Sequence, residues 1–193
     1  NTPAPRKIVE LILMRRCARL LSVLVTLATL CSGEAVRART AMVVTRESHA
    51  TDVGMTVLRT GGNAVDAAVA VGFALAVTHP SAGNIGGGGF MLVRLVDGQA
   101  TFIDFRERAP GRAGAGMYLD AAGNPTEESL YGYRAAGVPG TVRGLEYAHR
   151  KFGRRTWQQL LEPALALANQ GFPVSKGLAR SLRSSKALTR DAE

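Results

Sequence analysis

The sequence predicts an α+β protein with several helices and a β-hairpin. Three observations lead to this prediction: two helical patterns lie in residues 48–77, two strand patterns lie in residues 90–105, and further helical patterns follow residue 140. The chain has 193 residues, of which 46% are hydrophobic and 20% charged, as in an ordinary globular protein. One domain is therefore expected after a leader segment.

Residues 1–38 are predicted to be an upstream extension and a signal peptide. Residues 1–13 precede the expected initiator methionine, a basic stretch follows, and the apolar run Leu20–Cys31 leads to the small-residue pattern Val36-Arg37-Ala38. This order is typical of a secretory signal, and the run is shorter than the about 20 residues that a spanning helix needs. The sequence thus predicts export, to the periplasm or out of the cell, with no stable membrane span and with residues 39–193 as the mature part.

The net charge of +9 does not indicate nucleic-acid binding. Residues 1–40 hold seven Lys and Arg side chains against two acidic ones, and residues 174–193 hold five against two. Residues 41–173 hold 12 basic and 11 acidic side chains, so the predicted body has almost no net charge. Phosphate binding needs clustered basic residues, and no such patch is expected in the body.

Neither a metal site nor a cofactor is predicted. Both cysteines, Cys17 and Cys31, lie in the leader segment, so the mature part has no thiol that could bind metal or form a disulfide. The histidines His49, His79 and His149 are scattered and share no ligand spacing.

The body is expected to begin with a buried strand at Ala41–Thr45, a short apolar run rich in β-branched residues. A first helix is predicted over Ser48–Thr60, where Gly61-Gly62 ends it. Asn63 should cap a second helix, with an acidic residue in the first turn, where the positive end of the helix dipole favours it. This helix, Ala64–Val77, is apolar on nearly every face and is expected to be buried on all sides.

The hairpin is predicted from Phe90–Val96 and Ala100–Phe105. Between them lies Asp97-Gly98, a dipeptide that tolerates the positive φ angles of a tight turn. Residues 107–136 are rich in turn signals and are expected to be mostly loop.

Three more helices are expected after Gly140. The first should end near Gly153. Thr156 should cap the second, and Pro163 is expected to split or kink it, because proline lacks an amide hydrogen. The third pattern begins near residue 175 and has no terminating signal before Glu193, so the chain is interpreted as truncated.

A glycine-rich segment, Gly83–Phe90, holds five glycines in seven positions, which indicates that backbone approaches something closely there. Phosphate loops follow a strand and precede a helix, whereas this segment follows a helix and precedes a strand, so nucleotide binding is not expected. Two interpretations remain open. The segment is either a strand-entry loop packed tightly against another part of the chain or a loop that shapes a substrate cleft.

Arg106 is the main candidate for a binding residue. It lies in Asp104–Pro110, where the second hairpin strand ends, and a rigid element positions a side chain well at such a place. A guanidinium can hold a carboxylate through two parallel hydrogen bonds. From composition alone, a local ion pair with Asp104 or Glu107 is the better-supported alternative.

Five motifs in order resemble the γ-glutamyltransferase family, also called γ-glutamyl transpeptidases. They are Gly61–Ala70, Gly86–Met91, Asp104–Pro110, Ala136–Gly144, and Trp157–Ala164 followed by Gly171-Phe172. The resemblance covers about residues 41–177. One departure from the family pattern is the segment Arg46–Asp52, because the family often has a His-Pro pair before the first helix.

The resemblance implies the αββα sandwich of the N-terminal nucleophile hydrolases, incomplete here because the chain corresponds to the front of the large subunit. In this family a precursor cuts itself into a large and a small subunit, and the nucleophile is the Thr newly exposed at the start of the small subunit. Its own amine then acts as general base. By this resemblance the chain contains no catalytic residue, the nucleophilic Thr lies beyond Glu193, and the small subunit is the partner.

The resemblance also implies an activity. Enzymes of this family cleave the γ-glutamyl amide of glutathione and related compounds, form an acyl-enzyme, and transfer the γ-glutamyl group to water, amino acids or peptides. Arg106 matches the family arginine that holds the α-carboxylate of the γ-glutamyl group. The chain by itself is expected to be inactive. The alternatives are a β-lactam (cephalosporin) acylase of the same superfamily and a non-catalytic amino-acid-binding protein.

Overall fold

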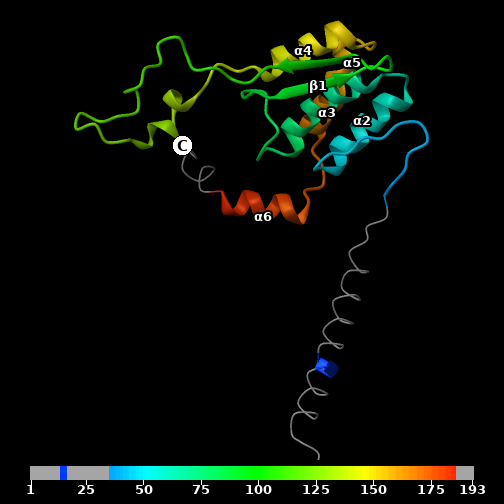
Figure 1. The fold of residues 1–193 in the computed structure, drawn as a ribbon, viewed down its shortest axis with the longest axis horizontal. Coiled ribbons are helices and arrows are strands. Elements are labelled where there is room, and N and C mark those ends of the chain that lie inside the picture. The colour runs from blue at the N-terminus through cyan, green and yellow to red at the C-terminus, as the bar shows by residue number, and fades with distance from the viewer. Residues whose placement is uncertain (1–13, 17–34, 186–193) are drawn as a thin grey trace, which may run out of the picture. The chain divides into compact units, whose positions relative to one another are not determined.

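The computed structural model describes residues 14–16 and 35–185 (Figure 1). The chain divides into two units, residues 1–40 and 41–193, and the helices and strands discussed below belong to the second. The predicted signal run Leu20–Cys31 lies outside the described residues. Within the described part, no helix has the length and hydropathy needed to cross a membrane.

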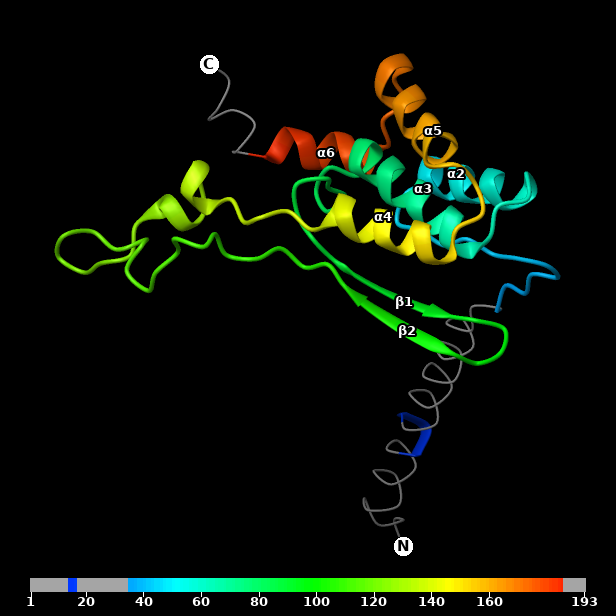
Figure 2. The same cartoon turned by 90° about the horizontal axis from the view of Figure 1, so that it is seen from above.

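The second unit is an α+β body, as predicted. Five helices and two strands follow the predicted order of the fold, and short 3₁₀ turns interrupt the long loop (Figures 1 and 2). The elements are α2 (Ser48–Arg59), α3 (Ala64–Thr78), β1 (Phe90–Arg94), β2 (Ala100–Asp104), two 3₁₀ turns (Glu127–Ser129 and Tyr133–Ala135), α4 (Thr141–Phe152), α5 (Trp157–Gln170) and α6 (Lys176–Ser184).

Helix α3 is central, and it contacts α2, α4 and α5. Asn63 caps it as predicted, because the Asn63 side chain accepts hydrogen bonds from the amides of Val65 and Asp66. The expectation that α3 is buried on all sides is wrong for one stripe. Ala64 and Ala68, four residues apart on the same side of the helix, are exposed because none of the described elements covers that side.

The segment Ala41–Thr45 forms no strand in the described structure, contrary to the prediction. A strand needs a neighbour to take up its backbone hydrogen bonds, and the sheet of the described residues contains only β1 and β2. The segment lies instead against α2, where the side chain of Val43 occupies the space that a side chain at Gly54 would need. Val43 therefore serves helix packing, whereas Val44 is exposed.

The two strands form the predicted antiparallel hairpin, with Phe90 opposite Asp104. The turn uses positive φ only at Gly98, at +88°. The Gly98 amide donates to the carbonyl of Leu95 at 3.0 Å, and the Leu95 amide donates to Gln99 at 2.9 Å, so the connection is longer than a two-residue turn. Strand β1 accordingly ends at Arg94 rather than at Val96, and β2 ends at Asp104, one residue earlier than predicted.

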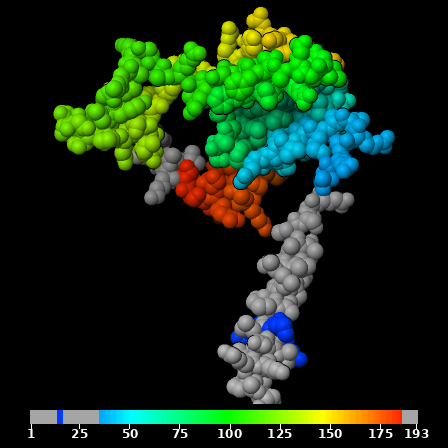
Figure 3. Space-filling view, viewed as in Figure 1, coloured from blue at the N-terminus to red at the C-terminus, as the bar shows by residue number. Residues whose placement is uncertain are grey.

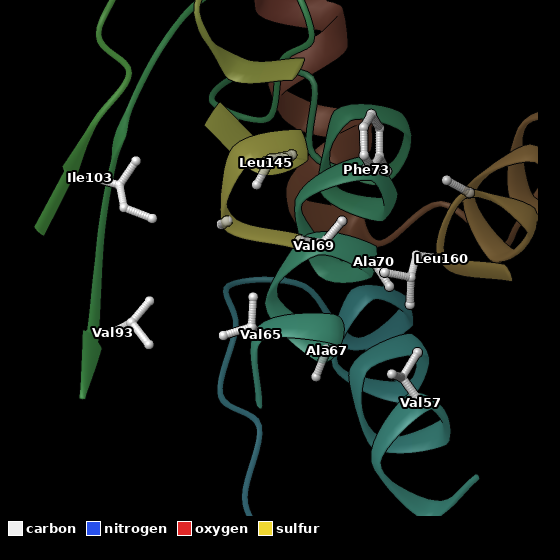
Figure 4. Close-up of a cluster of buried hydrophobic side chains, with 12 residues drawn as sticks. Val57, Val65, Ala67, Val69, Ala70, Phe73, Val93, Ile103, Leu145 and Leu160 are labelled. Carbon is white, nitrogen blue, oxygen red and sulfur yellow. The ribbon is translucent and has the colours of Figure 1, made fainter. Parts of the chain in front are cut away.

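One face of the hairpin completes the hydrophobic core. Val93 and Ile103 point from the strands toward the helices (Figure 4), and both are buried. On the helical side the core includes Val69 on α3, Leu145 on α4 and Leu160 on α5. The alternation of buried and exposed residues along the strands follows from the two-residue period of a β-strand.

Helix α5 is continuous through Pro163, so the predicted split is wrong. Proline removes one backbone hydrogen bond from the helix interior, at a cost of about 3 kcal/mol. Leu160 and Ala164 on either side of it are buried in the core, and their packing offsets this loss. Thr156 caps the helix as predicted, in a capping box with Gln159.

Residues 107–136 form the predicted loop region. They extend away from the helices as an arm (Figures 1 and 3), and its two short 3₁₀ turns contact each other. The arm leaves the body directly after β2 and returns to it just before α4. Both ends of the arm therefore meet at one place, where the candidate site lies.

Candidate substrate-binding site

A pocket of about 430 Å³ lies between the end of β2 and the first turns of α4. Its walls come from the last strand residues and the segment after them, from the segment that precedes α4, and from one side of α4. The polar and charged side chains at this pocket belong to Asp104, Arg106, Arg108, Arg143 and Tyr147.

Arg106 lies where the sequence predicted, immediately after β2. The Arg106 amide donates to the Asp104 carboxylate at 3.0 Å, and the neighbouring residue Phe105 still pairs with Gly89 through its amide, at 3.0 Å. Two residues later, Arg108 and Val138 form an isolated β-bridge, with hydrogen bonds of 3.2 and 2.8 Å. The backbone on both sides of Arg106 is thus fixed by the fold.

Arg106 is exposed and borders the pocket. The ion pairs among the described residues are Arg134–Glu128, Arg143–Glu146 and Arg150–Glu146. Arg106 therefore does not form the alternative local ion pair with Asp104 or Glu107. Asp104 instead binds the Arg106 backbone. Arg106 therefore keeps its donor groups available for a ligand.

The glycine-rich segment packs directly against the backbone that carries Arg106. A Cβ atom at Gly88 would overlap the Glu107 amide and the Arg106 carbonyl carbon, and one at Gly89 would lie 2.9 Å from the ring of Phe105. The segment does not border the pocket. The structure therefore favours the interpretation of a tightly packed strand-entry loop.

The same loop also holds the start of α4. The Gly87 carbonyl accepts hydrogen bonds from the amides of Gly140 and Thr141, at 2.8 and 3.1 Å. The Asn84 side-chain oxygen accepts from the Gly87 amide at 2.9 Å and from the Thr141 hydroxyl at 2.6 Å. The glycine loop thus joins two walls of the pocket, the Arg106 segment and α4.

Gly144 in α4 and Gly140 just before it allow α4 to lie close to the end of β2. A Cβ atom at Gly140 would overlap the carbonyl oxygen of Phe105, and one at Gly144 would overlap the Phe105 ring. These contacts give the physical reason for the glycines Gly140 and Gly144 of the sequence motif Ala136–Gly144.

Asp66 is a residue whose importance sequence reasoning missed. It is fully buried, and its carboxylate accepts hydrogen bonds from the amides of Asn63 at 2.9 Å, of Arg154 at 3.0 and 3.1 Å, and of Arg155 at 3.3 Å. Asp66 therefore fastens the start of α3 to the connection between α4 and α5. An acidic residue in an otherwise apolar helix was the available signal, but the sequence did not identify its partners 88 and 89 residues away.

We expect Gly88→Ala to lower kcat/KM of the complete gene product by about tenfold or more, because the added methyl group must displace the backbone that carries Arg106. Gly86→Ala is the matched control, since a Cβ atom at Gly86 meets nothing within 4 Å. Kinetics of both variants on the γ-glutamyl substrates that the motif resemblance implies measure the effect. Equal activity of the two variants would show that this close approach does not position Arg106.

Metal ligation has no geometric support in the described part of the chain, where no group of three or more His, Cys, Asp or Glu residues is arranged to hold an ion.

Comparison with known proteins agrees with the family expected from the motifs. The family model described as gamma-glutamyltranspeptidase matches residues 50–193. A glutathione hydrolase proenzyme from Pseudomonas sp. (strain A14) is 58% identical over 143 residues, which are 74% of this chain and 25% of the relative. The chain thus spans about a quarter of the length of this curated relative.

Solved structures give the same result. Gamma-glutamyltranspeptidase from Pseudomonas nitroreducens, complexed with L-DON, is 45% identical with a TM-score of 0.76, over 81% of this chain and 47% of that one. Cephalosporin acylase from Bacillus halodurans is 26% identical with a TM-score of 0.66, over 82% and 30%. These neighbours agree with the N-terminal nucleophile hydrolase class. The chain belongs to the gamma-glutamyltranspeptidase family.

Proposed function

We propose that the complete gene product cleaves the γ-glutamyl amide of glutathione and related compounds and transfers the γ-glutamyl group, through an acyl-enzyme, to water, amino acids or peptides. The family match over residues 50–193 and the 58% identity to a glutathione hydrolase proenzyme support this proposal. Residues 39–193 are then the N-terminal part of the large subunit of an αββα sandwich.

The observation that carries the proposal is the position of Arg106. Arg106 follows β2 between fixed backbone on both sides, is exposed at a pocket, and forms none of the ion pairs of the described residues. A γ-glutamyl group carries one free α-carboxylate, which a guanidinium can bind through two parallel hydrogen bonds. Arg106 would thereby fix the end of the substrate that does not react.

The reacting end requires a nucleophile, which we place outside this chain. None of its threonines lies in the Thr-Thr-His context of the family. A Thr at the start of a small subunit, released by self-cleavage of a precursor, would attack the γ-amide with its own amine as base. The small subunit would be the partner of this chain, and the leader pattern in residues 1–38 supports export of the precursor.

The proposal is tested by assaying the purified complete gene product for release of p-nitroaniline from γ-glutamyl-p-nitroanilide and of glutamate from glutathione. Turnover of both is expected. Hydrolysis of an acylated cephalosporin with no γ-glutamyl turnover would favour the acylase alternative. The structural similarity to cephalosporin acylase is the reason for testing this alternative. Binding of glutamate without any turnover would favour a non-catalytic binding protein.

A further inference from the structure

Three arginines border the pocket, although one is sufficient for an α-carboxylate. Arg106 and Arg108 follow β2, and Arg143 lies on α4. Arginine stays protonated at all physiological pH values, so all three side chains are cationic. Asp104 is the acidic side chain at this pocket, and its carboxylate already accepts the Arg106 amide. The pocket therefore has a surplus of positive charge.

Arg108 is the better placed of the two additional arginines. Its backbone is fixed by the β-bridge to Val138, whose amide and carbonyl both bind it. Its side chain is exposed and takes part in none of the ion pairs of the described residues. Arg106 and Arg108 both border this one pocket, so two cationic side chains belong to the same site.

Arg143 is available on the opposite wall. It pairs with Glu146 at 3.2 Å, but its side chain is 82% exposed, and exposed pairs of this kind contribute little. A ligand carboxylate can therefore approach Arg143 with little loss. The pocket thus offers charge complementarity for a ligand with more than one carboxylate.

We infer that Arg108 determines donor specificity by binding a second carboxylate, located on the leaving group of the γ-glutamyl donor, with Arg143 as the opposite wall. The inference rests on the proposed function, in which Arg106 holds the α-carboxylate. The preferred donors are γ-glutamyl peptides with a free C-terminal carboxylate, such as glutathione. Donors with neutral leaving groups leave Arg108 without a partner.

The test compares two donors that differ only at this carboxylate: glutathione and glutathione with its C-terminal carboxylate converted to an amide. Hydrolysis is measured in the complete gene product without an added acceptor, so that only donor binding is reported. Arg108→Ala is expected to lower kcat/KM for glutathione by about tenfold and to change kcat/KM for the amide less than about twofold. Arg108→Lys should recover part of the loss.

The matched control is Arg112→Ala, which removes an exposed arginine of the arm that does not border the pocket and should leave both donors unaffected. An equal loss on both donors would assign Arg108 to structure, and no loss on either would remove it from the site. Both results would overturn the inference. Absence of turnover of either donor by the unmodified protein would instead contradict the proposed function.

Discussion

Replacing Arg106 by alanine in the complete gene product is expected to raise the Michaelis constant for γ-glutamyl-p-nitroanilide by about 10- to 100-fold, while self-cleavage of the precursor proceeds. A charge-assisted hydrogen bond to a ligand contributes about 1.5–3 kcal/mol, which corresponds to a change of this size. Arg106 is exposed and carries no ion pair within the described residues, so its removal should cost little stability.

Steady-state kinetics of the processed enzyme measure this effect. Arg106→Lys keeps the charge but loses the planar fork, and it should lie between the unmodified enzyme and the alanine variant. Arg112→Ala serves as the control for loss of an exposed arginine from the same region. An unchanged Michaelis constant in Arg106→Ala would remove Arg106 from the site.

The second large effect is expected at Asp66, on stability. Asp66→Ala leaves the amides of Asn63, Arg154 and Arg155 without the carboxylate that they now share. Each partly buried amide that loses its partner costs about 1–3 kcal/mol, so we expect the free energy of unfolding to fall by about 3 kcal/mol or more. The cost is high because Asp66 is fully buried.

Urea denaturation of the complete gene product, followed by a probe in this region such as Trp157 fluorescence, measures the change. Asp52→Ala is the matched control, because Asp52 is an exposed aspartate on the neighbouring helix α2 and should change the free energy by less than about 0.5 kcal/mol. Equal midpoints for the two variants would show that Asp66 does not hold α3 to the α4–α5 connection.

Much of the fold could be predicted because its signals are local. The cap at Asn63, the glycines after α2 and the Asp97-Gly98 turn lie within a few residues of the boundaries that they set. Where a structure depends on distant neighbours, prediction was wrong. Ala41–Thr45 has strand composition but packs on α2, and Pro163 stays inside a helix because distant core residues hold that helix in place.

The candidate site likewise has a part that could be predicted from local signals and a part that depends on distant residues. The position of Arg106 at a strand end followed from the hairpin pattern, and its proposed role came from the family motif around it. The position of Arg143 at the same pocket could not be predicted. Arg106 and Arg143 belong to different parts of the fold, and the whole arm separates them in the sequence. The hydrogen bonds from the amides of Gly140 and Thr141 to the glycine loop could not be predicted for the same reason.

The central claim is that Arg106 binds the α-carboxylate of the γ-glutamyl group. The most direct measurement compares kcat/KM for γ-glutamyl-p-nitroanilide with that for its analogue lacking the α-carboxylate, 4-aminobutyryl-p-nitroanilide, in the unmodified enzyme and in Arg106→Ala. The unmodified enzyme should prefer the carboxylate substrate by about tenfold or more, and the variant should lose most of that preference. A variant that retains the full preference would contradict the account.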